Sequence, residues 1–109
     1  METKIIAGIR GWEARSEIPL DDGLRVLVIS THKVDGGKLM TWARGWKLTN
    51  TGHLMTEMFS DFKKCIYSER ARCTHAAVDR QQTAALAQAL EIKAEAEAFY
   101  KAKDGGVAA

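Results

Sequence analysis

The sequence predicts an α+β domain in which an antiparallel meander of three or four strands packs against a long C-terminal helix, with a short helix between. Two features lead to this prediction. The first half of the chain has runs rich in β-branched residues that are separated by turn sequences. Residues 75–103 are instead rich in Ala, Glu, Gln, Lys and Leu, which are good helix formers. With 109 residues, the chain is expected to form a single domain over 1–109.

The strands follow from these runs and from the turns between them. Residues 3–18 are expected to form the first strand, which ends at Pro19, and residues 20–23 form a turn. Residues 24–34, LRVLVISTHKV, predict the second strand. The sequence Asp35-Gly36-Gly37 predicts a tight turn, because glycine adopts positive φ at little cost. A third strand then covers residues 38–49, and the short connections make the strands antiparallel neighbours.

The segment 53–67 has two interpretations. Its apolar residues fall at 54, 55, 58, 59, 62, 65 and 66, which is a helical spacing. The preceding Asn50-Thr51-Gly52, however, is typical of a hairpin turn. The favoured interpretation is a fourth strand over 53–59 followed by a short helix over 60–67. A helix through the whole segment is the alternative.

The long helix is expected over residues 75–103, with Thr74 as its N-cap and Asp104-Gly105-Gly106 ending it. Its length of roughly 43 Å exceeds the width of a four-stranded sheet, so its far end is expected to protrude. One side of the helix is apolar: Val78, Ala85, Ala89, Ile92, Ala96 and Phe99. Because the end of this stripe lies beyond the expected sheet, we predict a homodimer.

Alternation of side chains along the strands divides the predicted sheet into two faces. One face is small and apolar, which suits close approach of the helix: Ile5, Ala7, Ile9, Val26, Val28, Leu39 and Ala43. The other face then carries all three tryptophans of the chain and four cations: Arg10, Trp12, Arg25, Lys33, Trp42, Arg44 and Trp46.

The tryptophan-rich face has three interpretations. Its rings and cations are suited to stacking unpaired bases and contacting phosphates. They are equally suited to anchoring a protein partner, since Trp and Arg dominate protein interfaces. The third interpretation is structural, with the tryptophans as core and Arg44 in a cation–π contact. A second cationic region, residues 63–72, adds four residues that would contact phosphates if nucleic acid binds: Lys63, Lys64, Arg70 and Arg72.

Other functional classes have little support in the sequence. The net charge of +2 is too small to imply general affinity for nucleic acid. Cys65, Cys73 and His75 do not have the spacing of a structural zinc site, so no metal and no cofactor are expected. No catalytic motif is recognised, and an enzyme is not predicted. Without a long apolar run, the chain is expected to be cytoplasmic and independent of membranes, with reduced cysteines.

Two resemblances add expectations about function. The segment EMFSDFKKCI, followed by ARCTHAAVDRQQTAALAQALEIKAEAEAFYKAK, resembles small uncharacterised phage and prophage proteins. That resemblance implies a non-enzymatic accessory role, in which the protein binds a host or phage protein and inhibits a host system. The order of four strands and a long helix is similar to the PC4-like single-strand-binding fold. This second resemblance is one of topology, and it implies single-stranded nucleic acid as the alternative partner.

Overall fold

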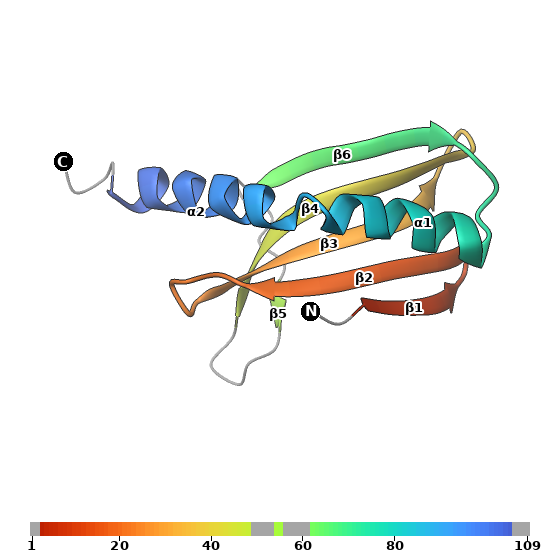
Figure 1. The fold of residues 1–109 in the computed structure, drawn as a ribbon. Coiled ribbons are helices and arrows are strands. Elements are labelled where there is room, and N and C mark those ends of the chain that lie inside the picture. Colours follow the sequence, from red (N-terminus) through yellow and green to blue (C-terminus); the bar gives the residue numbers. More distant parts are fainter. Residues whose placement is uncertain (1–2, 49–53, 56–61, 106–109) are drawn as a thin grey trace.

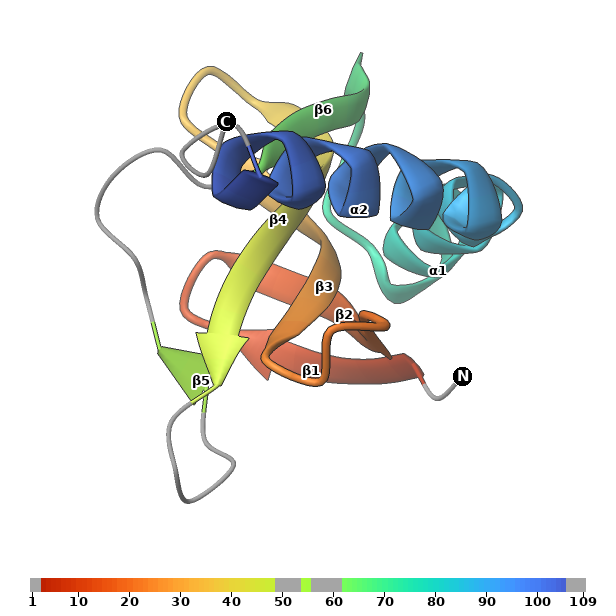
Figure 2. The same cartoon turned by 90° about the vertical axis from the view of Figure 1, so that its left-hand side faces the viewer.

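The computed structural model describes residues 3–48, 54–55 and 62–105, and it confirms the α+β fold class (Figure 1). The strands are β1 (Thr3–Gly8), β2 (Gly11–Pro19), β3 (Arg25–Val34), β4 (Lys38–Leu48), β5 (Leu54–Met55) and β6 (Lys63–Arg70). The helices are α1 (His75–Leu86) and α2 (Ala89–Gly105). Strands β1 to β4 follow one another across an antiparallel sheet, and β5 and β6 both pair with the remaining edge of β4. Figure 2 shows that both helices lie on the same side of this twisted sheet.

The segment 3–18, predicted as one strand, is a hairpin of β1 and β2. Gly8 pairs with Gly11, so the two residues between them make the turn. Gly11 has a φ of 115°, a conformation that favours glycine. The single-strand prediction is therefore wrong, and the spacing of these two glycines is the signal that reveals the turn. The consequence is that residues before and after the turn belong to separate strands.

Strands β3 and β4 confirm the second and third predicted strands and the glycine turn between them. Gly36 and Gly37 have φ values of 89° and 78°. The register pairs Thr31 with Thr41, so odd-numbered residues of both strands face the helices. The prediction that grouped Val26 and Val28 with Leu39 and Ala43 is wrong, because a shift of one residue moves a side chain to the opposite face. Leu27 and Ile29 occupy the helix-covered side instead.

Of the other residues predicted to face the helix, Ile5 packs against the core beside Leu39. Ala7 is exposed, and Ile9 lies in the β1–β2 turn. The side of the sheet that the helices cover is called the closed face below, and the opposite side is called the open face.

The short helix predicted over 60–67 is wrong where the chain is described, because residues 63–70 form β6, and residues 60–61 lie outside the described residues. An edge of β4 has backbone groups that need hydrogen-bond partners, and β6 supplies them. The register shifts between Thr41 and Trp42, which leaves Ile66 as an extra residue. Ile66 and Tyr67 therefore both pack against the core. Two adjacent inward side chains break the alternation of a strand, which explains the helix-like apolar spacing of this segment.

Strand β5 pairs with the last two residues of β4 and lies within the fourth strand predicted over 53–59. The rest of that prediction, at residue 53 and at 56–59, lies outside the described residues. The alternative helix through 53–67 is wrong where the chain is described, because both β5 and β6 are strands.

The long predicted helix is divided in two. The Thr74 side chain caps α1 by accepting a hydrogen bond from the Ala77 amide at 3.1 Å, as expected. A turn at residues 87–88 separates α1 from α2, and Figure 1 shows the last turns of α2 extending past the strand ends. The apolar stripe of the helices is buried against the sheet as far as Ala96. Of the residues on which the homodimer was predicted, Ile92 and Ala96 are 1% and 0% exposed and Phe99 is 38% exposed, and the homodimer stays a prediction.

Packing of α2 depends on a residue that has no side chain. Gly45 of β4 lies directly beneath Tyr100, and a Cβ atom at this position would clash with the tyrosine ring. The ring also stacks with the Arg25 guanidinium, whose central carbon is 4.1 Å from the ring centroid. Tyr100, and not the predicted Phe99, is thus the residue that anchors the C-terminal half of α2 in the core.

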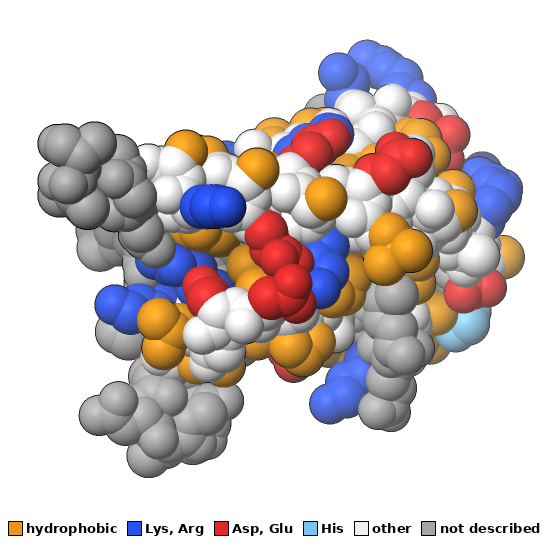
Figure 3. All heavy atoms as spheres, turned by 60° about the vertical axis from the view of Figure 1, so that its left-hand side comes forward, with side chains coloured by type: hydrophobic (Ala, Val, Ile, Leu, Met, Phe, Trp, Pro, Cys, Tyr) orange, Lys and Arg blue, Asp and Glu red, His pale blue; other side chains and the backbone are white. Residues whose placement is uncertain are grey.

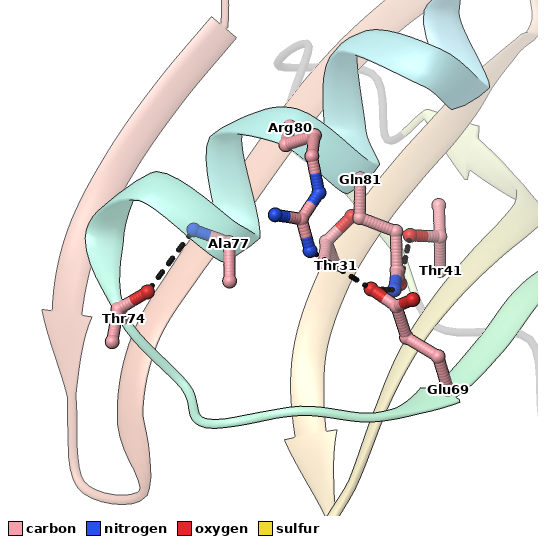
Figure 4. A network of polar contacts seen from close by, with 7 residues as sticks. All are labelled: Thr31, Thr41, Glu69, Thr74, Ala77, Arg80 and Gln81. Atoms are coloured by element: carbon pink, nitrogen blue, oxygen red, sulfur yellow. Dashed lines mark hydrogen bonds and ion pairs between the residues drawn. The ribbon is translucent and has the colours of Figure 1, made fainter.

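A buried polar network joins α1 to the closed face, and Figure 4 shows part of it. The Thr31 and Thr41 hydroxyls are 2.6 Å apart and each donates to a glutamine of α1 at 2.7 Å, Thr31 to Gln82 and Thr41 to Gln81. The Gln82 amide donates in turn to the Ser16 hydroxyl and to a β3 carbonyl. Because buried polar groups need partners, this network fixes the position of α1 on the sheet.

Candidate binding face

The alternation of Trp42, Arg44 and Trp46 places all three side chains on the open face, as the sequence predicts for a strand. All three are partly buried. Across the sheet, Trp42 lies opposite Ser30, Arg44 opposite Val28, and Trp46 opposite Val26. No described helix covers this side of the sheet, so the tryptophans and Arg44 form part of an accessible surface.

Cations lie over both tryptophan rings. The Lys63 ammonium is 4.8 Å from the centroid of the Trp42 ring, and the Arg44 guanidinium carbon is 5.5 Å from it. Arg15 is similarly placed 5.9 Å from the centroid of Trp46. The Nε atom of Arg44 is buried and has no hydrogen-bond partner among the described residues. The open face therefore contains a buried donor that the described part of the protein leaves unsatisfied.

Three pairs of cations lie directly opposite each other across neighbouring strands of the open face. They are Lys4–Arg15, Arg44–Lys63 and Lys38–Arg70. Like charges at directly opposite positions destabilise a sheet. Of these six cations, only Arg15 forms an ion pair within the described residues, with Glu17 at 3.2 Å. The free protein thus maintains repulsive contacts that an anion would relieve.

The charge of the open face differs from that of the helical side. The register assigns to the open face these six cations and two carboxylates, Glu13 and Glu17. That excess of four positive charges compares with +2 for the whole chain. On the helical side, acidic and basic side chains are intermingled (Figure 3), and Lys93 pairs there with both Asp21 and Glu97. Positive charge is therefore concentrated on the face that no helix covers.

A groove of about 590 Å³ crosses the open face. Its lining joins the Lys4–Arg15 pair to Arg44 and Trp46, with Glu13, Ser30 and His32 between them. Burial lowers the pKa of His32; Glu13 opposes this, and the charges of Arg44 and Arg10 lower the pKa further. The imidazole is therefore neutral near pH 7, with one nitrogen that donates and one that accepts a hydrogen bond.

Four residues predicted on the tryptophan-rich face lie elsewhere. Arg10 is in the β1–β2 turn, where it pairs with Asp35 at 2.9 Å. Trp12 lies on the closed side at the start of β2, with its ring 4.9 Å from that of His75. Arg25 and Lys33 also belong to the closed side, and Arg25 pairs with Asp22 at 2.9 Å. The error follows from the mismatched register of β3 and from the hairpin within residues 3–18.

The predicted phosphate contacts of the 63–72 segment are also divided. Lys63 and Arg70 lie on the open face. Lys64 points to the closed side, where its ammonium pairs with Glu95 at 2.8 Å. Arg72 is exposed in the connection to α1. Three further cations, Lys4, Arg15 and Lys38, complete the cation pairs and were not predicted from sequence, because their positions depend on strand pairing.

The cysteines and histidines considered as a metal site are spread over the molecule. Cys65 lies opposite Trp42 on the open face, whereas the Cys73 thiol donates to the Trp12 carbonyl at 3.0 Å. Within the described ranges, no group of three Cys, His, Asp or Glu side chains could hold a metal ion. Neither of the described helices is long and apolar enough to cross a membrane.

Comparison with known proteins gives no match: no family model, curated protein or solved structure is significantly similar to this chain. The resemblances to phage proteins and to the PC4-like fold therefore stay predictions. The function of the open face has to be inferred from its own geometry and charge.

Proposed function

We propose that the protein binds single-stranded nucleic acid on its open face, without catalysing a reaction. The observation that carries the proposal is the placement of two cation pairs, Lys4–Arg15 and Arg44–Lys63, at the groove of this face. Each pair is repulsive in the free protein, and a phosphate between its two members would replace the repulsion by two attractive contacts. A polyanion is the ligand that engages several such pairs at once.

The tryptophans favour a single strand over a duplex. Trp42 and Trp46 lie among the cations, and unpaired bases stack on such rings whatever their sequence. In a duplex the bases are already stacked and paired, so the rings would contribute little. The Lys63 and Arg44 groups now over Trp42 are the ones that would move to phosphates when a base takes their place on the ring.

Fluorescence anisotropy of a labelled oligothymidylate of about 15 nucleotides tests the proposal, a length within the range that small single-strand-binding domains cover. We expect binding that weakens as salt is raised, with a logarithmic slope of about 0.7 for each phosphate contacted. A duplex of the same length should bind more weakly. Absence of binding at low salt, or affinity that does not change with salt, would refute the proposal.

Two tryptophan variants provide a matched comparison. Trp42→Ala removes a stacking ring and should reduce affinity about tenfold, since each stacked base contributes roughly 1–3 kcal/mol. Trp12→Ala removes a ring from the closed side and should leave affinity unchanged. Thermal melts of both variants separate loss of binding from loss of folding.

A protein partner is the second candidate, and it corresponds to the accessory role that the resemblance to phage proteins implies. The observation in its favour is the β1–β2 hairpin, where Ile6 and Ile9 are 58% and 105% exposed. Exposed apolar residues of this kind are typical of interfaces. Binding of that kind would be insensitive to salt and would be weakened by Ile9→Glu in the hairpin turn, whereas nucleic-acid binding in the groove would not require Ile9, which is not among the groove-lining residues.

A further inference from the structure

We propose that the bound strand crosses the sheet, from the Arg44–Lys63 pair along the groove to the Lys4–Arg15 pair. This inference rests on the proposed function and specifies the path of the ligand. It assigns the third cation pair, Lys38–Arg70, to a position off the path. The strand would then run across the β-strands and not along β4.

The arrangement of the groove distinguishes the two paths. The groove lining includes Lys4, Arg15 and Arg44. Lys63 lies next to it as the cross-strand neighbour of Arg44, whereas neither Lys38 nor Arg70 is in the lining or directly opposite a residue that is. The first pair lies between β1 and β2 and the second between β4 and β6, so three inter-strand spacings, roughly 14 Å, separate them. Lys38 is instead six residues along β4 from Arg44, roughly 20 Å away. The shorter path is also the one that a continuous hollow connects.

The groove between the two pairs has the chemistry of a base-reading site. Glu13 and Ser30 line it, together with a neutral His32 and the Trp46 ring. Glu17 also lines it and pairs with Arg15 at 3.2 Å, a contact that a phosphate at this end would replace. A carboxylate in the position of Glu13 would repel a phosphate, but it accepts hydrogen bonds from the N–H groups of base edges. The two ends of the groove therefore suit phosphates and its middle suits unpaired bases. That alternation requires a single strand, because the base edges of a duplex are occupied by pairing.

Two double variants that remove the same charge test the path. Lys4→Gln with Arg15→Gln removes the pair at the end of the groove, and Lys38→Gln with Arg70→Gln removes the pair off the path. Binding of the labelled oligothymidylate is measured for both as a function of salt. On the proposed path, the first variant should lose about tenfold in affinity and about 1.4 in salt slope, which corresponds to two single-strand contacts. The second should stay within about twofold of the wild type, because separated surface charges are screened.

The outcomes separate failure of the path from failure of the function. Equal losses for the two variants would overturn the path and would indicate attraction by overall charge. A larger loss for Lys38→Gln with Arg70→Gln would also overturn it and would place the strand along β4. If the wild type binds no oligonucleotide, the proposed function itself fails.

A crosslinking measurement on the wild-type protein gives an answer that does not depend on the folding of variants. Oligothymidylate with photoreactive 5-iodouracil bases should crosslink to Trp46, in the groove wall, and to the peptide that carries Arg15. Crosslinks confined to the peptides that carry Lys38 and Arg70 would contradict a path through the groove.

Discussion

Alternate residues of the same strands form two faces that differ in whether their polar groups have hydrogen-bond partners. On the closed face, Thr31, Thr41 and the two glutamines of α1 satisfy one another in a buried network. On the open face, Arg44 has a buried donor without a described partner and stands opposite another cation. The network around the two threonines has its partners within the described residues, whereas the Nε atom of Arg44 on the open face has none there.

This difference separates residues that maintain the fold from residues available for function. A protein that needed only stability would place opposite charges across neighbouring strands, since such pairs stabilise a sheet. The open face instead has three like-charge pairs, against one, Arg25–Lys47, on the closed side. Five of the six open-face cations have no ion pair within the described residues. Substitutions on the two faces should therefore change stability by different amounts and, in one case, in opposite directions.

The largest loss of stability is expected from Leu27→Ala on the closed face. Leu27 is fully buried between the sheet and the helices, and truncation of such a residue costs about 2–5 kcal/mol. The matched change on the open face is Ser30→Ala, which should alter the free energy of unfolding by less than about 0.5 kcal/mol. Urea denaturation measures both. Similar losses for the two variants would remove the distinction between the faces.

The next largest effect tests the polar network. Thr41→Val keeps the volume of the side chain but leaves the Gln81 carbonyl oxygen without the hydroxyl that now donates to it at 2.7 Å. Loss of a buried partner costs about 1–3 kcal/mol. Thr41→Ser retains the hydroxyl and should lose less of the unfolding free energy. If the valine variant is as stable as the serine variant, the network does not position α1.

A smaller effect, confined to acidic pH, is expected from His32 on the open face. Its pKa is lowered from 6.5, chiefly by burial, with Arg44 and Arg10 adding to the shift against Glu13. The unfolded chain therefore takes up a proton first, so the contribution of His32 to stability is present above the unfolded pKa and is lost as the pH falls through the folded one.

The His32→Asn variant checks this contribution. Its melting temperature should fall less than that of the wild type between about pH 7.5 and about pH 5, the range in which histidine titrates. Parallel slopes for the two proteins would mean that His32 does not contribute to the acid sensitivity of the fold.

The same contrast explains how much of the fold was predictable from sequence. Local signals succeeded: Gly36 and Gly37 require positive φ, and Thr74 caps α1 with its own side chain. Strand β6 was missed because it depends on the edge of β4 and on a bulge that brings Ile66 and Tyr67 to the same side. Such pairing is a property of the assembled sheet, and a local pattern does not contain it.

The candidate face was predictable only within one strand. Trp42, Arg44 and Trp46 share a side because alternation in β4 is local. The faces of the other strands were matched to β4 by the types of residue they carry. For β3 that match was off by one residue, so Arg25 lies on the side opposite to the predicted one. The pairs Lys4–Arg15 and Lys38–Arg70 required the register of two strand pairs, so they emerge only from the structure.

The smallest expected change is an increase in the free energy of unfolding, whereas the core and network variants above decrease it. Lys63 faces Arg44 directly, so Lys63→Glu replaces a repulsive cross-strand pair by an attractive one. We expect the free energy of unfolding to rise by about 0.2–1 kcal/mol. Binding of a single strand should nevertheless weaken about tenfold, because a phosphate contact is replaced by a repulsion. Urea denaturation and anisotropy, measured on one preparation, give both quantities.

The neighbouring residue supplies the control for this prediction. Lys64 points to the closed side and pairs with Glu95, so Lys64→Glu makes the same charge change while placing two carboxylates together. That variant should lose up to about 1 kcal/mol of stability and retain more affinity than Lys63→Glu, since surface ion pairs contribute little. If Lys63→Glu is more stable but no longer binds, and Lys64→Glu is less stable but still binds, the Arg44–Lys63 repulsion is maintained for a ligand. If Lys63→Glu also lowers stability, the contact of Lys63 with Trp42 stabilises the fold. The Arg44–Lys63 pair would then no longer support a binding function for the open face.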